Sequence, residues 1–323
     1  NINIKINKGV LNMNNLKKVG LTALGTVLVS STAIAGELTV TGSAGVTLTG
    51  EDNSNKGNGW TMGDSLTFSG SAEQDNGWNV TMSQEIDGGA LDDFSIKVDM
   101  GDMGTVTFAG HGTTGVIGNW DDLTPTANEE AHGVSVAGTQ DGAANGVSEN
   151  DSFHWDYDVA AVDGLSTKIS YFPSDNTSHA DSSIEYGARY TGIEGLDIAL
   201  GMGENNDTTN GVDNTVAAVS YTMDSISLGM QANESDSAAA SSDEDFSAWG
   251  VSYAVSDDLS VSYNISEIDY EDATKENQEA TGISFSYTSG SMTFSGAYSE
   301  VDNTAGTATD DNSGYELNLS FTF

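Results

Sequence analysis

The sequence predicts an all-β fold, an antiparallel β-barrel of about 16 strands. Three observations predict it. Apolar residues recur at every second position in one short segment after another, the connections between these segments alternate between long and short, and the chain has 38 glycines but only 2 prolines. Period-two alternation is the pattern of a strand with one apolar and one polar face, and glycine without proline suits many tight turns between paired strands.

The alternating segments follow one another along the chain and are the expected strands. The first is apolar at Leu38, Val40, Val46 and Leu48, and the last alternates up to an aromatic residue at its end. The predicted strands lie within 38–48, 66–72, 78–86, 94–100, 106–108, 153–159, 165–171, 184–190, 196–202, 217–223, 226–230, 249–255, 259–265, 283–287, 292–298 and 315–323.

The connections between the predicted strands alternate in length almost throughout. The long ones are 50–63, 111–150, 173–182, 204–213, 234–245, 270–279 and 300–313. The short ones are 74–76, 101–103, 160–164, 192–194, 224, 256–257 and 289–290. One connection on the long side, Asp87–Leu91, is brief. Long loops at one end and tight turns at the other are typical of bacterial outer-membrane barrels, so the barrel is expected to be transmembrane.

The beginning of the sequence predicts export. Met13 starts a segment with Lys17 and Lys18, a short apolar run follows from residue 19 to 29, and Ala33-Ile-Ala35 resembles a cleavage site. This order is that of a secretory signal peptide. We therefore expect residues 1–12 to be upstream read-through, residues 13–35 to be a cleaved signal peptide, and residues 36–323 to be the barrel domain.

The charge balance excludes one large class of partners. The chain has 49 acidic and 9 basic residues, and all the acidic but only five of the basic residues follow Ala35, so residues 36–323 carry a formal charge of 5 − 49 = −44. Such a surface repels nucleic acid and attracts cations. The absence of cysteine excludes disulfides, thiolate metal sites and a cysteine nucleophile. After Ala35 the sequence has no segment that could span a membrane as a helix, so a membrane role requires a closed barrel.

The alternation also predicts which side chains face the barrel interior. In a membrane barrel the apolar positions face lipid, so the residues between them face the lumen. Lys97, Lys168 and Arg189 are the basic residues at such positions. The acidic residues at such positions are Glu73, Glu85, Asp99, Asp156, Asp158, Glu185, Asp197 and Glu316. A charged interior holds water, and about 16 strands leave an open channel instead of a filled core.

The signal peptide, the terminal Phe323 and the single very long loop after the fifth strand resemble those of Gram-negative general-diffusion porins, most closely the small alphaproteobacterial ones. The resemblance covers the whole of 36–323, through pattern and connectivity more than through motifs. It implies that the long loop folds into the barrel and narrows the lumen, with acidic loop residues facing basic residues on the wall. The implied acidic residues are Asp121, Asp122, Glu129 and Glu130, and the implied basic ones are Lys97, Lys168 and Arg189.

The resemblance also implies a homotrimer and recognition by the barrel-insertion machinery, for which Tyr315, Phe321 and Phe323 are the expected signal. Two features depart from the family pattern, because there is no arginine ladder and the second outer loop is short. Small outward-facing residues on the first two strands could form the contact between barrels or could ease strand curvature; these are Gly42, Ala44, Gly70 and Ala72.

Other motifs are weak. Residues 110–115 match the G-x-G-x-x-G pattern, but no helix is expected after them, as a dinucleotide site would require. Residues 52–57 begin like a calcium loop, but Lys56 occupies a ligand position. The histidines, which are His111, His132, His154 and His179, show no spacing that predicts zinc binding or catalysis. Carboxylates in two outer loops could bind Ca²⁺ or Mg²⁺ weakly; they are Asp236, Asp243, Glu244, Asp245, Asp302, Asp310 and Asp311.

The sequence therefore predicts a passive, water-filled outer-membrane channel for small hydrophilic solutes and ions, with a preference for cations. It predicts no catalytic residues, no cofactor and no dedicated metal site, and its expected surroundings are outer-membrane lipid and lipopolysaccharide. A substrate-specific channel would share every feature used so far. An outer-membrane barrel enzyme or a secreted acidic β-adhesin are the remaining alternatives.

Overall fold

The computed structural model describes residues 38–51, 59–112, 115–131, 133–134, 146–147, 151–174, 181–206, 211–239 and 241–323. The predicted signal peptide and the segment before it lie outside these residues, as do residues 52–57, His132 and His179. No helix in the described ranges is both long and apolar enough to cross a membrane.

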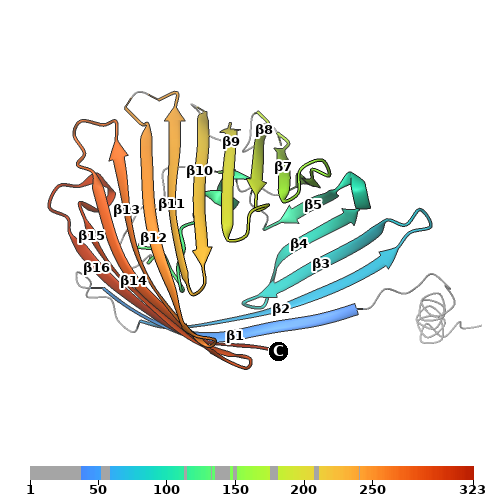
Figure 1. Cartoon of the computed structure of the whole chain (residues 1–323), viewed down its shortest axis with the longest axis horizontal. Coiled ribbons are helices and arrows are strands. Elements are labelled where there is room, and N and C mark those ends of the chain that lie inside the picture. The colour runs from blue at the N-terminus through green and yellow to red at the C-terminus, as the bar shows by residue number, and fades with distance from the viewer. Residues whose placement is uncertain are drawn as a thin grey trace, which may run out of the picture.

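The strands form one closed antiparallel barrel, in which each strand pairs with the next and β1 closes on β16 (Figure 1). Sixteen strands and an antiparallel closed sheet confirm the predicted fold class. The strands are β1 (Leu38–Glu51), β2 (Trp60–Glu73), β3 (Asn79–Asp87), β4 (Ala90–Asp99), β5 (Thr105–His111), β6 (Ser152–Asp158), β7 (Leu165–Phe172), β8 (Ser183–Tyr190), β9 (Leu196–Asn205), β10 (Val212–Met223), β11 (Ile226–Ser237), β12 (Glu244–Ser256), β13 (Leu259–Tyr270), β14 (Gln278–Ser289), β15 (Met292–Asp302) and β16 (Asn312–Thr322). The short helices are η1 (Gly101–Met103), α2 (Ile117–Trp120) and η3 (Thr304–Gly306).

Several strands are longer than the alternation predicts. β2 begins at Trp60, which pairs with Leu48, and not at residue 66. β11 and β12 extend toward the long-loop end, so that Glu234 pairs with Asp245. Backbone pairing thus continues where both faces are polar and no apolar alternation marks it. As a consequence, four carboxylates expected in outer loops lie in strands instead: Asp236, Glu244, Asp245 and Asp302.

The two faces of the wall differ in polarity. One face exposes large apolar side chains, for example Leu200 (55% exposed), Met202 (60%) and Met230 (61%). The alternate positions, here called the inner face, carry polar residues such as Gln231 and Asn233. An apolar outer surface around a polar interior is the reverse of a water-soluble protein and suits a barrel in lipid.

The chain end completes the barrel seam. Phe323 N donates to Gly42 O at 2.9 Å, and Gly42 N donates to Phe323 O at 2.8 Å, so pairing between β1 and the last residue continues to the end of the chain. A Cβ on Gly42 would lie 2.6 Å from Phe323 Cε2. The aromatic ring therefore covers Gly42, which gives this glycine a role within one barrel, whereas nothing lies within 4 Å of a Cβ placed on Gly70.

Candidate functional site: a loop held against the inner face

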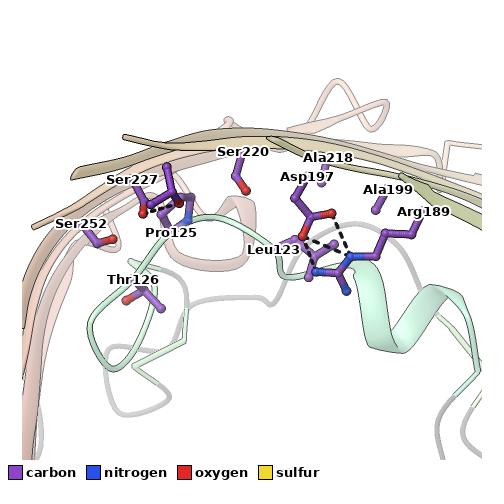
Figure 2. Close-up of a pocket in the computed structure, with 11 residues that line it drawn as sticks. Leu123, Pro125, Thr126, Arg189, Asp197, Ala199, Ala218, Ser220, Ser227 and Ser252 are labelled. Atoms are coloured by element: carbon purple, nitrogen blue, oxygen red, sulfur yellow. Dashed lines mark hydrogen bonds and ion pairs between the residues drawn. The ribbon is translucent and has the colours of Figure 1, made fainter. Parts of the chain in front are cut away.

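The long connection between β5 and β6 lies along the inner face of the wall. Its first described part contains α2, and Val116, Ile117 and Trp120 pack there in one buried cluster. Their partners in the cluster are Ala199, Val216 and Ala218, on β9 and β10. Figure 2 shows Leu123, Pro125 and Thr126, which follow α2, on the concave side of the wall. The loop is thus fixed first by apolar contacts at positions where the wall carries small side chains.

Amide side chains of the wall then bind the loop backbone. Gln231 Oε1 accepts a hydrogen bond from Leu123 N at 2.6 Å, and Gln231 Nε2 donates to Trp120 O at 3.2 Å. Asn233 Nδ2 donates to Asp121 O at 3.0 Å. A loop without regular structure must satisfy its peptide groups with side chains when it lies against a wall, and amides provide both donors and acceptors.

An amide and a hydroxyl group continue this anchoring on the next strands. Asn264 Nδ2 donates to Pro125 O at 3.1 Å. Ser284 Oγ accepts a hydrogen bond from Asn128 N at 3.0 Å and lies 3.2 Å from Thr126 Oγ1. Farther along, Ala131 and Val134 pack against three small side chains of β14 and β15, namely Ala280, Ala297 and Val301. Residues 115–131 therefore contact the wall from β8 to β15.

Glu185 holds the beginning of this loop. Its Oε2 accepts a hydrogen bond from Ile117 N and its Oε1 one from Val147 N, both at 3.0 Å. The side chain is buried, with 1% exposure, beneath the loop. Glu185 was predicted to line the channel, but the structure places it under the loop as an acceptor for loop N–H groups.

The four acidic loop residues differ in their surroundings. Asp122 is exposed, Asp121 and Glu129 are half-buried, and Glu130 is buried. Burial, the nearby charge of Asp122 and a hydrogen bond with its side chain raise the pKa of Glu130 to about 9. Glu130 is therefore neutral at pH 7, so that the negative charge expected at this position in the sequence is not present.

The basic wall residues also differ. Arg189 Nε donates to Asp197 Oδ1 at 2.8 Å, and the guanidinium makes a second contact with the other carboxylate oxygen. This pair lies beside a pocket of about 280 Å³ between Leu123, Pro125 and the wall (Figure 2). Lys168 lies across from Asp156 in the β6–β7 pair. Among the described residues Lys97 takes part in no ion pair, and its cross-strand neighbours are Thr81 and Thr107.

The closed antiparallel β-barrel is also the fold of the solved structures that this chain matches. A family model described as Gram-negative porin matches residues 20–288. The chain belongs to the Gram-negative porin family. This confirms the resemblance seen in the sequence, and membership of the family supports an outer-membrane porin channel.

Solved structures of outer-membrane proteins, porins among them, share the fold of this porin at low sequence identity. An anion-selective porin from Comamonas acidovorans has a TM-score of 0.66 at 13% identity, over 89% of this chain and 100% of that chain. The outer-membrane expressed OmpT of Vibrio cholerae has a TM-score of 0.66 at 14% identity, over 90% and 98%. A mutant of Rh. blastica porin has a TM-score of 0.59 at 14% identity, over 89% and 100%. A sequence search of curated proteins returned no match.

The remaining predicted site residues of the porin lie apart from the loop anchors. Asp99 is at the short-turn end of β4, where its Oδ1 accepts a hydrogen bond from Gly101 N at 2.9 Å. Glu85 is on β3, in a small pocket with His111. The aromatic residues of the predicted insertion signal are exposed on β16 and at the chain end: Tyr315, Phe321 and Phe323.

The described histidines and the glycine-rich motif have structural surroundings of their own. His154 is buried on β6, with Nε2 2.8 Å from Ser152 Oγ and Nδ1 2.9 Å from Ser170 Oγ. Gly110 is in β5 and no helix of nucleotide-binding length follows it in the described residues. The aspartates expected at outer loops and not moved into strands are Asp243, Asp310 and Asp311.

The residues that hold the loop were missed by sequence reasoning. Gln231, Asn233, Asn264 and Ser284 are the principal ones. Each occupies an inner-face position of a predicted strand or its extension, where any polar residue fits the alternation. One signal for these anchors is their residue type. Amides and small hydroxyl residues cluster on β11 to β14, whereas the predicted site residues are nearly all charged.

Proposed function

We propose that this porin is a passive, water-filled channel for small hydrophilic solutes and ions, that the loop of residues 115–131 forms its constriction, and that it prefers cations. The observation that carries the proposal is the anchoring of this loop to the inner face from β8 to β15. A loop that occupies part of the interior reduces the open cross-section, and pore width and lining charge then select the solutes.

The proposed preference for cations rests on the balance of charge around the lumen, where carboxylates outnumber basic side chains. Arg189 is neutralised by Asp197, and Lys168 faces Asp156. Asp121, Asp122 and Glu129 supply negative charge on the loop even though Glu130 is neutral at pH 7. A channel lined mainly by carboxylates concentrates cations and repels phosphate and other anions. The Comamonas acidovorans porin is described as anion-selective, and we propose the opposite selectivity for this chain from its own charges.

The proposed surroundings are those of an exported outer-membrane trimer. Residues 13–35 would direct export, and Tyr315, Phe321 and Phe323 would be read by the insertion machinery. Small outward-facing residues such as Ala44 and Gly70 would allow barrels to approach closely, and carboxylates at the outer rim would share weakly bound Ca²⁺ or Mg²⁺ with lipopolysaccharide phosphates. Cross-linking of the protein in native outer membranes would give a trimer if this assembly is correct and only monomers if it is not.

The test of the channel proposal is a planar bilayer experiment with detergent-purified protein across a KCl gradient. We expect stepwise openings and a reversal potential that favours K⁺, shifted toward zero by the variant D121N/D122N and away from zero by K97E. Stepwise openings with an anion-favouring potential would refute the charge argument. The absence of openings from folded protein would refute the open channel.

A further inference from the structure

Two irregularities in adjacent strand pairs bring acidic residues and a histidine together near the outer end of β4. In the β3–β4 pair the register passes from Gln84 opposite Phe94 to Ile86 opposite Leu91, so that Glu85 faces both Asp92 and Asp93. An extra residue of this kind is a β-bulge, which disrupts the alternation of the strand and redirects side chains.

The second irregularity lies in the β4–β5 pair. Phe94 is opposite His111, whereas Ser95 is opposite Ala109, so Gly110 is the extra residue on β5. The two bulges bring together side chains that simple alternation would keep apart. Bulges recur at barrel rims and beside functional sites, where they aim a side chain.

The geometry of the cluster is that of a potential metal site. His111 Nδ1 lies 3.6 Å from Asp93 Oδ1 and 3.8 Å from Asp92 Oδ1, and one ligand atom from each residue lies within 4.8 Å of the others. Donors around one cation at about 2.0–2.2 Å from it are separated by no more than about 4.4 Å, so small rotations of these side chains bring them into range. The next residue, Gly112, has φ +72°, and a Cβ there would fall 1.5 Å from Asp93 Oδ1. Only a glycine leaves room for the carboxylate at this position.

The histidine nitrogen has no hydrogen-bond partner in the described part of the chain, and the acceptors near it are the two aspartate oxygens of the cluster. His111 Nδ1 is buried from solvent and makes no hydrogen bond with any described residue, although the ring as a whole is 44% exposed. In contrast, both ring nitrogens of His154 have hydroxyl partners. The two aspartate side chains are half-exposed, so an ion can reach them from solvent.

We propose that Asp92, Asp93 and His111 bind a first-row divalent transition metal such as Zn²⁺. One imidazole nitrogen and two carboxylate oxygens form a mixed N/O donor set, and imidazole favours Zn²⁺ and its neighbours over Ca²⁺ and Mg²⁺, which prefer oxygen alone. Glu85 lines the same pocket of about 180 Å³, together with Ser83 and Thr67, and offers a further carboxylate. The formal charge of the chain, −40, raises the local concentration of any cation.

The position of the site links it to the channel, a link that rests on the proposed function. Thr67, Ser83 and Ser95 line the pocket at inner-face positions, and His111 is the last residue of β5 before the loop connection. A divalent cation bound there neutralises two carboxylates beside the channel and at the root of the constriction loop. Bound Zn²⁺ is therefore expected to lower the cation current.

Binding can be measured without any channel recording. Full-length folded protein in detergent is titrated with ZnCl₂ by calorimetry, and Co²⁺ is used as a spectroscopic probe of nitrogen ligation. We expect a saturable site of one Zn²⁺ per chain whose affinity falls at least tenfold in H111A and in D92N/D93N. The matched control D257N/D258N also removes two adjacent, exposed aspartates, in the β12–β13 turn, and should leave Zn²⁺ affinity unchanged.

Folding of each variant is checked by circular dichroism and by heat-modifiable migration on a gel, and D93N serves as the milder variant if the double substitution does not fold. Equal Zn²⁺ affinity in H111A and the unsubstituted protein would overturn the proposal and leave a histidine–carboxylate ion pair only.

The channel link is tested separately in bilayers. Zn²⁺ should reduce the current of the unsubstituted protein but not of H111A, and saturable binding without any change in current would refute the link alone. Binding without channel openings in KCl would instead refute the proposed function and leave the metal site intact.

Discussion

The barrel wall has two halves that differ in what covers their inner face. No residue of β1 to β4 is buried, whereas β11 alternates exposed outer residues with buried inner ones such as Gln231, Asn233 and Ser235. The difference arises because residues 115–131 lie on the second half. A charge on the first half meets the channel water directly, and the same charge on the second half is shielded by the loop or paired with a neighbour.

The largest expected effect comes from removing the acceptor that holds the start of the loop. Glu185→Ala leaves the N–H groups of Ile117 and Val147 without their partner, and each buried donor left unsatisfied costs about 1–3 kcal/mol. We expect the loop to detach, with faster hydrogen exchange at Ile117 and a larger, noisier conductance. Glu73→Ala, the same change on the uncovered half, is the control, and equal effects of the two substitutions would erase the distinction between the halves.

A second way to release the loop is to raise the pH. The pKa of Glu130 is raised in the folded protein to about 9, above its ordinary value of 4.5. Its contribution to stability is therefore complete below about pH 4.5, declines above it, and is lost as the pH rises through 9. We expect current noise to increase as the pH rises from about 5 to 9, and then to level off, in the unsubstituted protein. It should stay constant in E130Q, in which an uncharged amide replaces the carboxyl. Identical pH profiles would show that Glu130 does not titrate in this range.

Single anchors on the covered half should each contribute a smaller amount. Asn233→Ala removes the hydrogen bond to Asp121 O, which is worth about 0.5–1.5 kcal/mol. Hydrogen exchange should accelerate in residues 117–123 and not elsewhere. Thr81→Ala on β3 is the matched polar deletion on the uncovered half, where no acceleration in the loop is expected. A loop unaffected by Asn233→Ala would mean that the apolar cluster of Val116 and Trp120 suffices.

The smallest expected effect is on charge selectivity. At 0.1 M salt the field of an exposed charge is screened beyond about 10 Å, so removing one charge shifts the reversal potential only slightly. Lys97→Gln and Arg189→Gln remove the same charge from the two halves. We expect the shift in reversal potential to be larger for Lys97, since Arg189 is paired with Asp197 beside the loop. A larger shift for Arg189→Gln would place the path of ions on the other side of the loop.

The barrel itself could be predicted from the sequence. Period-two alternation of apolar residues, and the alternation of long and short connections, are what a sheet closed in an outer membrane requires. The strand ends could not, since β2 and β11 continue beyond the apolar band, where alternation no longer reports pairing. The role of the acidic loop residues in the constriction stays a prediction, and the neutral state of Glu130 could not be predicted because it depends on burial beside Asp122. The meeting of Asp92, Asp93 and His111 was also hidden, because it depends on two bulges that shift the register.

Water and ions are expected to follow the uncovered half of the wall. The chain has no cysteine, so single cysteines can be introduced without background. Ser69→Cys lies on β2 and Ser284→Cys on β14, where Ser284 Oγ accepts a hydrogen bond from the loop. A charged, water-soluble thiol reagent applied to open channels should change the current stepwise in Ser69→Cys and leave Ser284→Cys unchanged. Rapid modification of Ser284→Cys with no response from Ser69→Cys would show instead that ions pass along the half of the wall that the loop covers.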